Sequence, residues 1–225
     1  MGLYGTTGNS HLYNNACTGL PNFNAAQTIS IRMQFDTIVG TEGLLTFRNN
    51  AASYGITLGK RTNRIAVWGW GGIIIVDDPT SPTSGWHHVV YTWSGSARQL
   101  FVDGQLKNTS GNSPSSGNMD EILISGWNPA TNSEAWSGII EELRVYNRVL
   151  SNEEIQELYL KHGGAMIING LVAWFKFLEG HEGVAIPTTP NLVKDYSING
   201  NHLTRVQDSG IAWKGSELNW SRRSA

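Results

Sequence analysis

Two tryptophans spaced two residues apart, Trp68 and Trp70, are the side chains of this chain best suited to bind a ligand. Side chains at i and i+2 of a β-strand project from the same face. Gly69, Gly71 and Gly72 predict uncrowded surroundings for both indoles. Neighbouring indoles can form a flat apolar platform on which a sugar ring stacks. We therefore predict a ligand-binding surface here; the alternative is that both rings lie in the core, because large β-sandwiches bury many tryptophans.

Three further residues complete the predicted ligand-binding set. Trp127 and Trp136 bracket a polar loop that we expect at one rim of the fold. Arg144 is assigned as a hydrogen-bond donor to the ligand, alongside polar loop residues.

The acidic residues do not form a recognisable catalytic set. Glu141 and Glu142 are adjacent in an expected strand, and so are Asp120 and Glu121, so the members of each pair point to opposite faces. Retaining glycoside hydrolysis needs two carboxyl groups about 5–5.5 Å apart on one cleft. The Gly-x-Ser-x-Gly pattern and a convincing Ser-His-Asp set are both absent. We expect no catalytic residues and no enzymatic activity, with a glycanase as the remote alternative.

Two adjacent histidines, His87 and His88, also lie in an expected strand. Their side chains point to opposite faces, so they cannot bind one metal ion together in regular β geometry. We predict structural roles for both, with one ring packed and the other exposed.

The composition excludes several classes of protein. The chain has 225 residues, a net charge of −2 and only 15% charged residues, without a basic stripe, which argues against nucleic-acid binding. No apolar run approaches the ~18 residues of a membrane span. The single cysteine, Cys17, excludes an intramolecular disulfide. The first 15 residues lack the positive and apolar segments of a signal peptide, so none is predicted.

Most of the elements that must position these residues are expected to be β-strands. Residues 27–35, QTISIRMQF, alternate between apolar and polar side chains, as a half-buried strand does. Turn signals at 94–96 and at Asp103-Gly104 separate further strands. The other expected strands are 44–47, 54–58, 64–70, 73–76, 87–93, 99–102, 105–107, 121–125, 139–146, 171–177 and a short one at 211–213.

One short surface helix is predicted near residues 151–162. Ser151 and Glu154 have the spacing of a capping box, in which each side chain accepts a hydrogen bond from the other residue's backbone N–H. Ile155, Leu158 and Tyr159 form a narrow apolar stripe, and Gly163-Gly164 is a helix stop.

Two segments carry a resemblance to a known family. GWHHVVYTWSGSARQLFVDGQL, residues 85–106, resembles the central hairpin of the laminin-G-like (concanavalin A-like) jelly-roll family. WSGIIEELRVYNRVLSNEEIQELY, residues 136–159, resembles its closing strand and short helix. The resemblance implies an all-β fold, a two-sheet antiparallel jelly-roll sandwich in a family of lectins and glucanases.

A third segment matches the family in an unusual position. LVAWFKFLEGHEGV and DYSINGNHLT resemble the opening of such domains but lie within residues 171–204. We favour a single domain over 1–225 in which residues 166–225 supply the usual opening strands. A tail strand on its own would leave its apolar face uncovered. The alternative is a core over 1–165 with 166–225 as a separate tail, or as one that completes a neighbouring copy.

The resemblance also implies a structural calcium ion near the closing strand and the opening loops. Glu141 is expected on the face of Ile139, Leu143 and Val145, where a carboxylate must be paired or bound to a cation. The nearby loops offer hard oxygen donors of the kind that calcium prefers. The predicted metal set is Glu141, Glu179, Asp195, Asn199 and Asn201. The alternative is an ordinary turn rich in Asp and Asn.

These observations favour a non-catalytic, lectin-like module that binds carbohydrate through exposed tryptophans. The alternative is a structural component of a larger assembly, such as a virus-particle decoration or a tail or fibre protein. The expected partners are a carbohydrate or another protein, with homo-oligomer formation through the C-terminal segment as a further option. The sequence leaves the location open, with a virion and an extracellular surface as options; nucleic acid and membrane are not expected partners.

Overall fold

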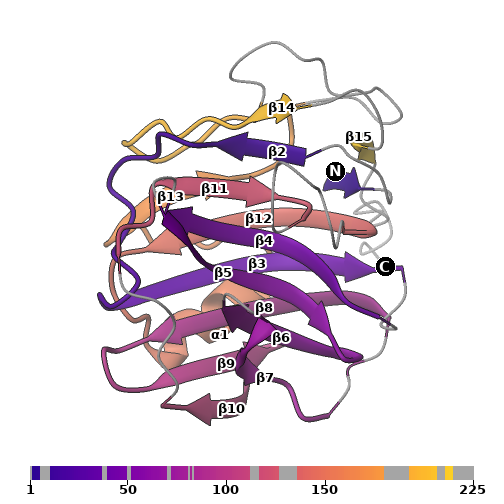
Figure 1. Cartoon of the computed structure of the whole chain (residues 1–225), viewed down its shortest axis with the longest axis vertical. Helices are drawn as coiled ribbons and strands as arrows, with labels where there is room; N and C mark the ends of the chain where they lie inside the picture. The colour runs from indigo at the N-terminus through magenta and orange to yellow at the C-terminus, as the bar shows by residue number, and fades with distance from the viewer. Residues whose placement is uncertain are drawn as a thin grey trace, which may run out of the picture.

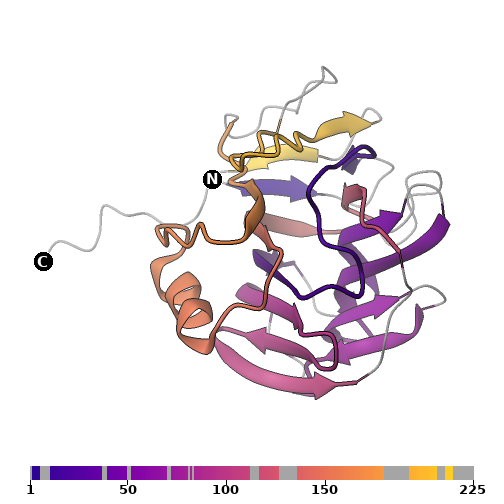
Figure 2. The same cartoon turned by 90° about the vertical axis from the view of Figure 1, so that its left-hand side faces the viewer.

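The computed structural model describes residues 2–5, 11–36, 40–49, 52–69, 72–80, 82, 84–111, 117–126, 136–179, 193–206 and 211–214. Over these residues the chain forms two antiparallel β-sheets packed face to face, with one short helix outside (Figures 1 and 2). The predicted all-β jelly-roll sandwich is therefore confirmed. No helix in this part of the chain is long and apolar enough to cross a membrane.

Sheet A has the strand order β10-β9-β8-β3-β12-β1-β15, and β13 also pairs with β12. Its strands are β10 (Gln105–Ser110), β9 (Arg98–Val102), β8 (Gly85–Trp93), β3 (Gln27–Phe35), β12 (Gly138–Tyr146), β1 (Gly2–Gly5), β15 (Ile211–Lys214) and β13 (Leu171–Phe175). Sheet B has the order β14-β2-β11-β4-β5-β6-β7. Its strands are β14 (Thr204–Val206), β2 (His11–Asn14), β11 (Glu121–Ile124), β4 (Glu42–Asn49), β5 (Ala52–Arg61), β6 (Arg64–Gly69) and β7 (Ile74–Asp77).

The central hairpin follows the turn chemistry of its sequence. Asp103 and Gly104 have φ angles of 53° and 75°, the left-handed conformation that a tight turn between β9 and β10 requires. The Asp103 carboxylate also accepts hydrogen bonds from the backbone N–H of His88 and from Nδ1 of His87, at 2.9 and 2.8 Å. The turn residue therefore fixes the neighbouring strand β8 as well.

Helix α1 (Asn152–Lys161) lies outside sheet A, as Figure 2 shows. Its predicted capping box between Ser151 and Glu154 is present. Ile155 and Leu158 pack against Val90 and Tyr146 in a small apolar cluster on the outer face of the sheet, apart from the main core between the sheets. The helix thus covers one part of this face and leaves the part near β13 to other side chains.

The strands of the C-terminal segment pair with both sheets of the chain. β13 pairs with residues 143–146 of β12, and β1 pairs with residues 138–140 along the same edge. β14 pairs with β2, and β15 pairs with β1 (Figure 1). Phe175 and Phe177 are fully buried in the main core. The three pairings by β1, β2 and β14 were not anticipated, because no strand was expected at residues 2–5, 11–14 or 204–206.

We predict that a chain ending at residue 165 loses most of its stability, because it lacks β13 to β15 and the core side chains of Phe175 and Phe177. Urea denaturation followed by circular dichroism measures the loss. A chain ending at Lys214 keeps every described strand and serves as the control. A soluble, monomeric 1–165 protein with the unfolding free energy of the full chain would show that residues 166–225 are no part of this domain.

Candidate functional site

The predicted tryptophan platform is not exposed at Trp68. This side chain is 3% exposed, and the guanidinium carbon of Arg61 lies 5.6 Å from its ring centroid. A Cβ added to Gly72 would lie 2.2 Å from Arg61, so the glycine-rich surroundings are crowded rather than open. Side chains alternate along β6, so Trp68 lies on the face that points away from the core residue Val67. On that face the guanidinium group of Arg61 covers it. Trp70 lies outside the described residues.

Trp136 and Arg144 are also buried. Trp136 is 1% exposed, and its ring centroid lies 4.9 Å from that of Phe35, so it belongs to the core between the sheets and not to a binding rim. Arg144 is 2% exposed, so the structure does not place its guanidinium on an open surface. Trp127 lies outside the described residues.

The contacts of Arg144 give it a structural role. Nη1 donates to the carbonyl of Ala165 at 2.7 Å, and Nη2 donates to the carbonyl of Gly163 at 2.9 Å and to Oε2 of Glu142 at 3.0 Å. The guanidinium carbon lies 4.5 Å from the ring centroid of Trp174. One buried cation therefore joins β12, the segment after α1, and β13.

A β-bulge in β12 reverses the predicted orientation of the residues after Glu141. The pairing with β3 shifts between Glu141 and Arg144, and Glu142 has a φ angle of 54°. The extra residue places Leu143 and Val145 in the core while Glu141 lies on the outer face. There Glu141 pairs with Arg32, so the expectation that it shares the apolar face was wrong.

The two carboxylates of the bulge form two similar stacks with arginines and tryptophans. Arg32 pairs with Glu141 and lies 4.1 Å from the ring centroid of Trp86. In the second stack Glu142 pairs with Arg144 and accepts a hydrogen bond of 2.9 Å from Nε1 of Trp174. Each carboxylate is thus held by a guanidinium.

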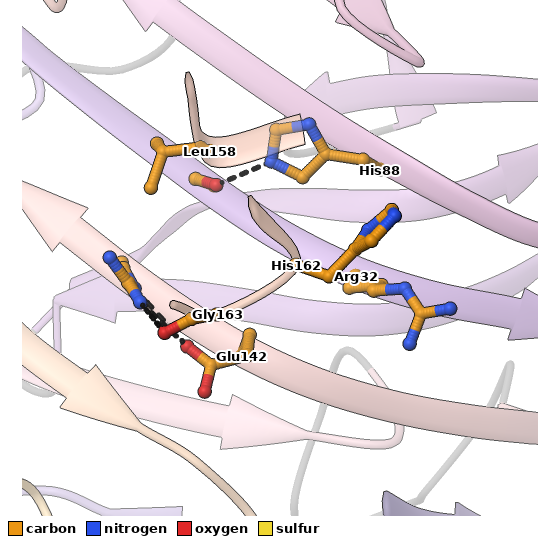
Figure 3. Close-up of a pocket in the computed structure, with 8 residues that line it drawn as sticks. Arg32, His88, Glu142, Leu158, His162 and Gly163 are labelled. Carbon is orange, nitrogen blue, oxygen red and sulfur yellow. Dashed lines mark hydrogen bonds and ion pairs between the residues drawn. The ribbon is translucent and has the colours of Figure 1, made fainter. Parts of the chain in front are cut away.

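A small cavity lies between the two stacks, beneath the end of α1 (Figure 3). Its volume of about 10 Å³ has room for about one water molecule. It is lined by Ser30, Arg32, His88, Glu142, Arg144, Leu158, His162 and Gly163. A sugar ring does not fit this space, so the cavity is not the ligand site.

Both histidines of strand β8 are buried, so the prediction that one is exposed was wrong. His88 lies beneath α1, where its ring stacks on Tyr159 and its Nε2 lies 2.9 Å from the hydroxyl of Ser30. Burial lowers the pKa of His88 to about 4, so the ring is neutral at pH 7. His87 lies on the opposite face and contacts Phe35. Helix α1 was predicted, but the pattern of residues in the strand did not show that the helix covers His88.

The predicted calcium ligands of the C-terminal segment come together in one turn. Oδ1 of Asp195 accepts hydrogen bonds from the backbone N–H groups of Trp174 and Ser197, and Oδ2 accepts one from Asn201, all at 2.8 Å. The side chain of Asn201 bonds the backbone of Thr18 through both its oxygen and its nitrogen.

Protein donors therefore engage these oxygens, which agrees with the Asx-turn interpretation. Asn199 donates to the carbonyl of Val172, and Glu179 accepts from the backbone N–H of Lys194 at the edge of the same turn. Glu141 pairs with Arg32 instead. In the described part of the chain no three His, Cys, Asp or Glu side chains form a metal-binding group. Calcium binding stays a prediction.

The exposed aromatic group of this region is Tyr196, in a cluster that the sequence did not predict. We call Trp174, Lys176, Glu179, Lys194 and Tyr196 the Tyr196 cluster. Tyr196 is 38% exposed, and its ring centroid lies 6.1 Å from that of Trp174. Nζ of Lys176 lies 4.1 Å from the Trp174 centroid and 4.5 Å from the Tyr196 centroid, while Nζ of Lys194 lies 5.1 Å from the latter.

Backbone contacts hold this cluster in place. The backbone N–H of Tyr196 donates to the carbonyl of Trp174 at 2.7 Å, and Asp195 forms a β-bridge with Phe175. Burial is the main cause that raises the pKa of the Glu179 carboxyl group, and the neighbouring side chain of Tyr196 lowers it. The signal in the sequence was the alternation of Trp174 and Lys176 along one strand, but their meeting with Tyr196 depends on the turn.

Residues 6–156 match the family model Laminin_G_3, which describes the concanavalin A-like lectin/glucanases superfamily. The chain belongs to this superfamily. Its predicted resemblance is thereby confirmed, and the Tyr196 cluster lies beyond the matched residues.

Known proteins similar to this concanavalin A-like chain include one curated relative. It is 25% identical over 122 residues to the rat protein "Sushi, von Willebrand factor type A, EGF and pentraxin domain-containing protein 1" (Rattus norvegicus). The match covers 48% of this chain and 3% of that protein, so the chain spans a small part of the relative.

Two solved structures share the fold. The native heptameric SAP-like pentraxin from Limulus polyphemus has a TM-score of 0.57 at 18% identity, with 80% of this chain and 89% of that chain covered. A putative carbohydrate binding protein from Bacteroides ovatus has a TM-score of 0.63 at 15% identity, with 94% of this chain and 58% of that chain covered. At these identities the likeness concerns the fold.

We predict that Asp195→Asn lowers the unfolding free energy of this concanavalin A-like domain by about 1–3 kcal/mol, because at least one buried N–H loses its acceptor. Urea denaturation measures the change, and Asp36→Asn at an exposed position is the control. The same titrations with millimolar calcium test the metal. A stabilisation by calcium that Asp195→Asn removes establishes the predicted site; no stabilisation leaves the turn held by hydrogen bonds alone.

We also predict an acid-dependent loss of stability from His88. The unfolded imidazole has a pKa of about 6.5, above the folded value of about 4, so the unfolded state binds the proton more tightly in this range. The stabilising contribution is present above pH 6.5 and is lost as the pH falls toward 4, by about 3 kcal/mol in total. The His88→Gln variant has no imidazole at this position and lacks this pH dependence. The unfolding free energy of the wild type minus that of the variant should therefore decrease by this amount as the pH falls from 6.5 to 4. A difference that does not change with pH contradicts the assignment.

Proposed function

We propose that this chain is a non-catalytic carbohydrate-binding module whose ligand contacts the Tyr196 cluster. The observation that carries the proposal is the ring of Tyr196, which is exposed beside Trp174 in a member of the concanavalin A-like lectin/glucanases superfamily. An exposed aromatic ring offers its apolar face to the C–H groups of a sugar, while nearby polar groups bond the hydroxyls.

The surroundings of Tyr196 supply both parts of such a site. Its position is set by the backbone bond to Trp174 and by the contact of its ring with the Trp174 ring, so little conformational freedom is lost when a ligand stacks on it. The ammonium groups of Lys176 and Lys194 lie within 5.1 Å of the same ring and provide hydrogen-bond donors.

The other candidates of this chain fit a sugar less well. Trp68 and Trp136 are buried, and the cavity beneath α1 has room for about one water molecule. The carboxylates of Glu141 and Glu142 are held by arginines, which supports binding without catalysis. The Bacteroides ovatus structure, described as a putative carbohydrate binding protein, supports the same class of function.

A structural role in a larger assembly is the second candidate function. The observation that favours it is a run of exposed apolar side chains at the end of α1 and just after it, Leu160, Met166 and Ile168. Apolar groups gathered on a surface favour contacts with another protein. This candidate uses a different part of the molecule from the Tyr196 cluster, so the two can be tested separately.

We predict that a glycan array probed with the purified chain gives hits that Tyr196→Ala reduces by at least about tenfold in affinity, because the stacking surface is removed. Tyr13→Ala changes a partly exposed tyrosine of sheet B and should leave binding unchanged. Isothermal titration with the best hit gives the affinities.

Two outcomes would contradict the proposal in different ways. Binding lost in Trp70→Ala but kept in Tyr196→Ala would move the site to the tryptophan pair that the sequence first indicated. No hit on the array, together with association of the chain at high concentration in sedimentation experiments, would favour the assembly role.

A further inference from the structure

We infer that the carbohydrate bound at the Tyr196 cluster is acidic, with a carboxylate or sulfate group held by Lys176 and Lys194. This inference rests on the proposed function and adds the chemical class of the ligand. It comes from the two lysines and not from the family, whose matched residues end at 156.

The two lysines differ from most basic side chains that the structure describes. Those others pair with a carboxylate of the same chain: Arg32, Arg48, Lys60, Arg64, Arg144, Arg148 and Lys161. For Lys176 and Lys194 the described residues provide aromatic rings and no ion pair. Two cations with no carboxylate partner among the described residues thus lie beside the exposed ring of Tyr196.

The geometry places both ammonium groups where one ligand can reach them. Their Nζ atoms lie 4.5 and 5.1 Å from the Tyr196 centroid, so they are at most about 10 Å apart. A cation–π contact with a ring face does not occupy a particular N–H bond of the ammonium group. Each lysine therefore keeps N–H donors that can bond an anion. Charge-assisted bonds to a carboxylate or sulfate are stronger than bonds to a neutral hydroxyl.

The carboxylate of the Tyr196 cluster, Glu179, does not neutralise the two lysines. Glu179 accepts a hydrogen bond from the backbone N–H of Lys194, and no ion pair joins it to either ammonium group. Its role is to hold the backbone of the turn. The pair of lysines therefore favours an external anion, with the sugar ring on or beside Tyr196.

Matched probes test the charge of the ligand directly. We would titrate the full chain with oligogalacturonate and with its methyl ester, which removes the carboxylate charge and keeps the ring. Dextran sulfate and dextran form the second pair, for the sulfate source. We expect at least one charged probe to bind at least about tenfold more tightly than its neutral partner, with an affinity that falls as NaCl rises from 50 to 300 mM.

Substitution of the lysines assigns the charge to this site. Lys176→Met and Lys194→Met should each weaken binding of the charged probe at least about fivefold, and by a clearly larger factor than they weaken binding of the neutral probe, which loses only hydrogen bonds to its hydroxyls. Lys107→Met is the matched control, because Lys107 contacts Gln105 and no carboxylate. Lys194→Arg keeps the charge and should restore most of the affinity, and near-ultraviolet circular dichroism checks the fold of each variant.

The outcomes separate this inference from the function on which it rests. Equal binding of charged and neutral probes, lost in Tyr196→Ala, overturns the acidic ligand and keeps carbohydrate binding. If Lys107→Met reduces the preference for the charged probe as much as Lys176→Met and Lys194→Met do, the site is overturned. The preference then reflects only the net charge of the chain. No binding of any probe, together with no hit on the glycan array, overturns both.

Discussion

The outer face of sheet A depends on the compensation of one buried charge, the guanidinium of Arg144. A cation removed from water is costly unless ionised or polar groups surround it. Glu142, two carbonyl groups and the ring of Trp174 do so here. These partners come from β12, the segment after α1, and β13. Helix, bulge and C-terminal strand are therefore fixed relative to one another by one side chain.

The bulge in β12 is the backbone feature that makes this compensation work. In a regular strand Glu141 and Glu142 point to opposite faces, and one carboxylate faces the core. The left-handed conformation of Glu142 and the register shift bring both carboxylates to arginines of the outer face, while Leu143 stays in the core. The unfavourable left-handed conformation of Glu142 is offset by the two ion pairs. The same arrangement fixes Trp174 next to the ring of Tyr196.

The C-terminal segment combines a structural and a surface role. Phe175 and Phe177 complete the core, whereas Trp174 and Lys176 on the other face of the same stretch contact Tyr196. Asp195 ties the turn to β13 through the backbone N–H of Trp174. The family model matches residues 6–156, so the part of the chain that carries the exposed ring lies outside the matched range.

The all-β class, most strand positions and the capped helix could be predicted from local patterns, because alternation, turn residues and capping involve neighbouring residues only. Residues 27–35 were predicted and found as β3, and Ser151 and Glu154 form the predicted capping box. Which side chains are covered depends instead on the packing of distant segments: Arg61 lies over Trp68, α1 lies over His88, and the bulge reorients β12. This packing also brings Lys194 and Tyr196 to Trp174. Exposure and charge pairing are properties of contacts between distant segments, which a local pattern does not contain.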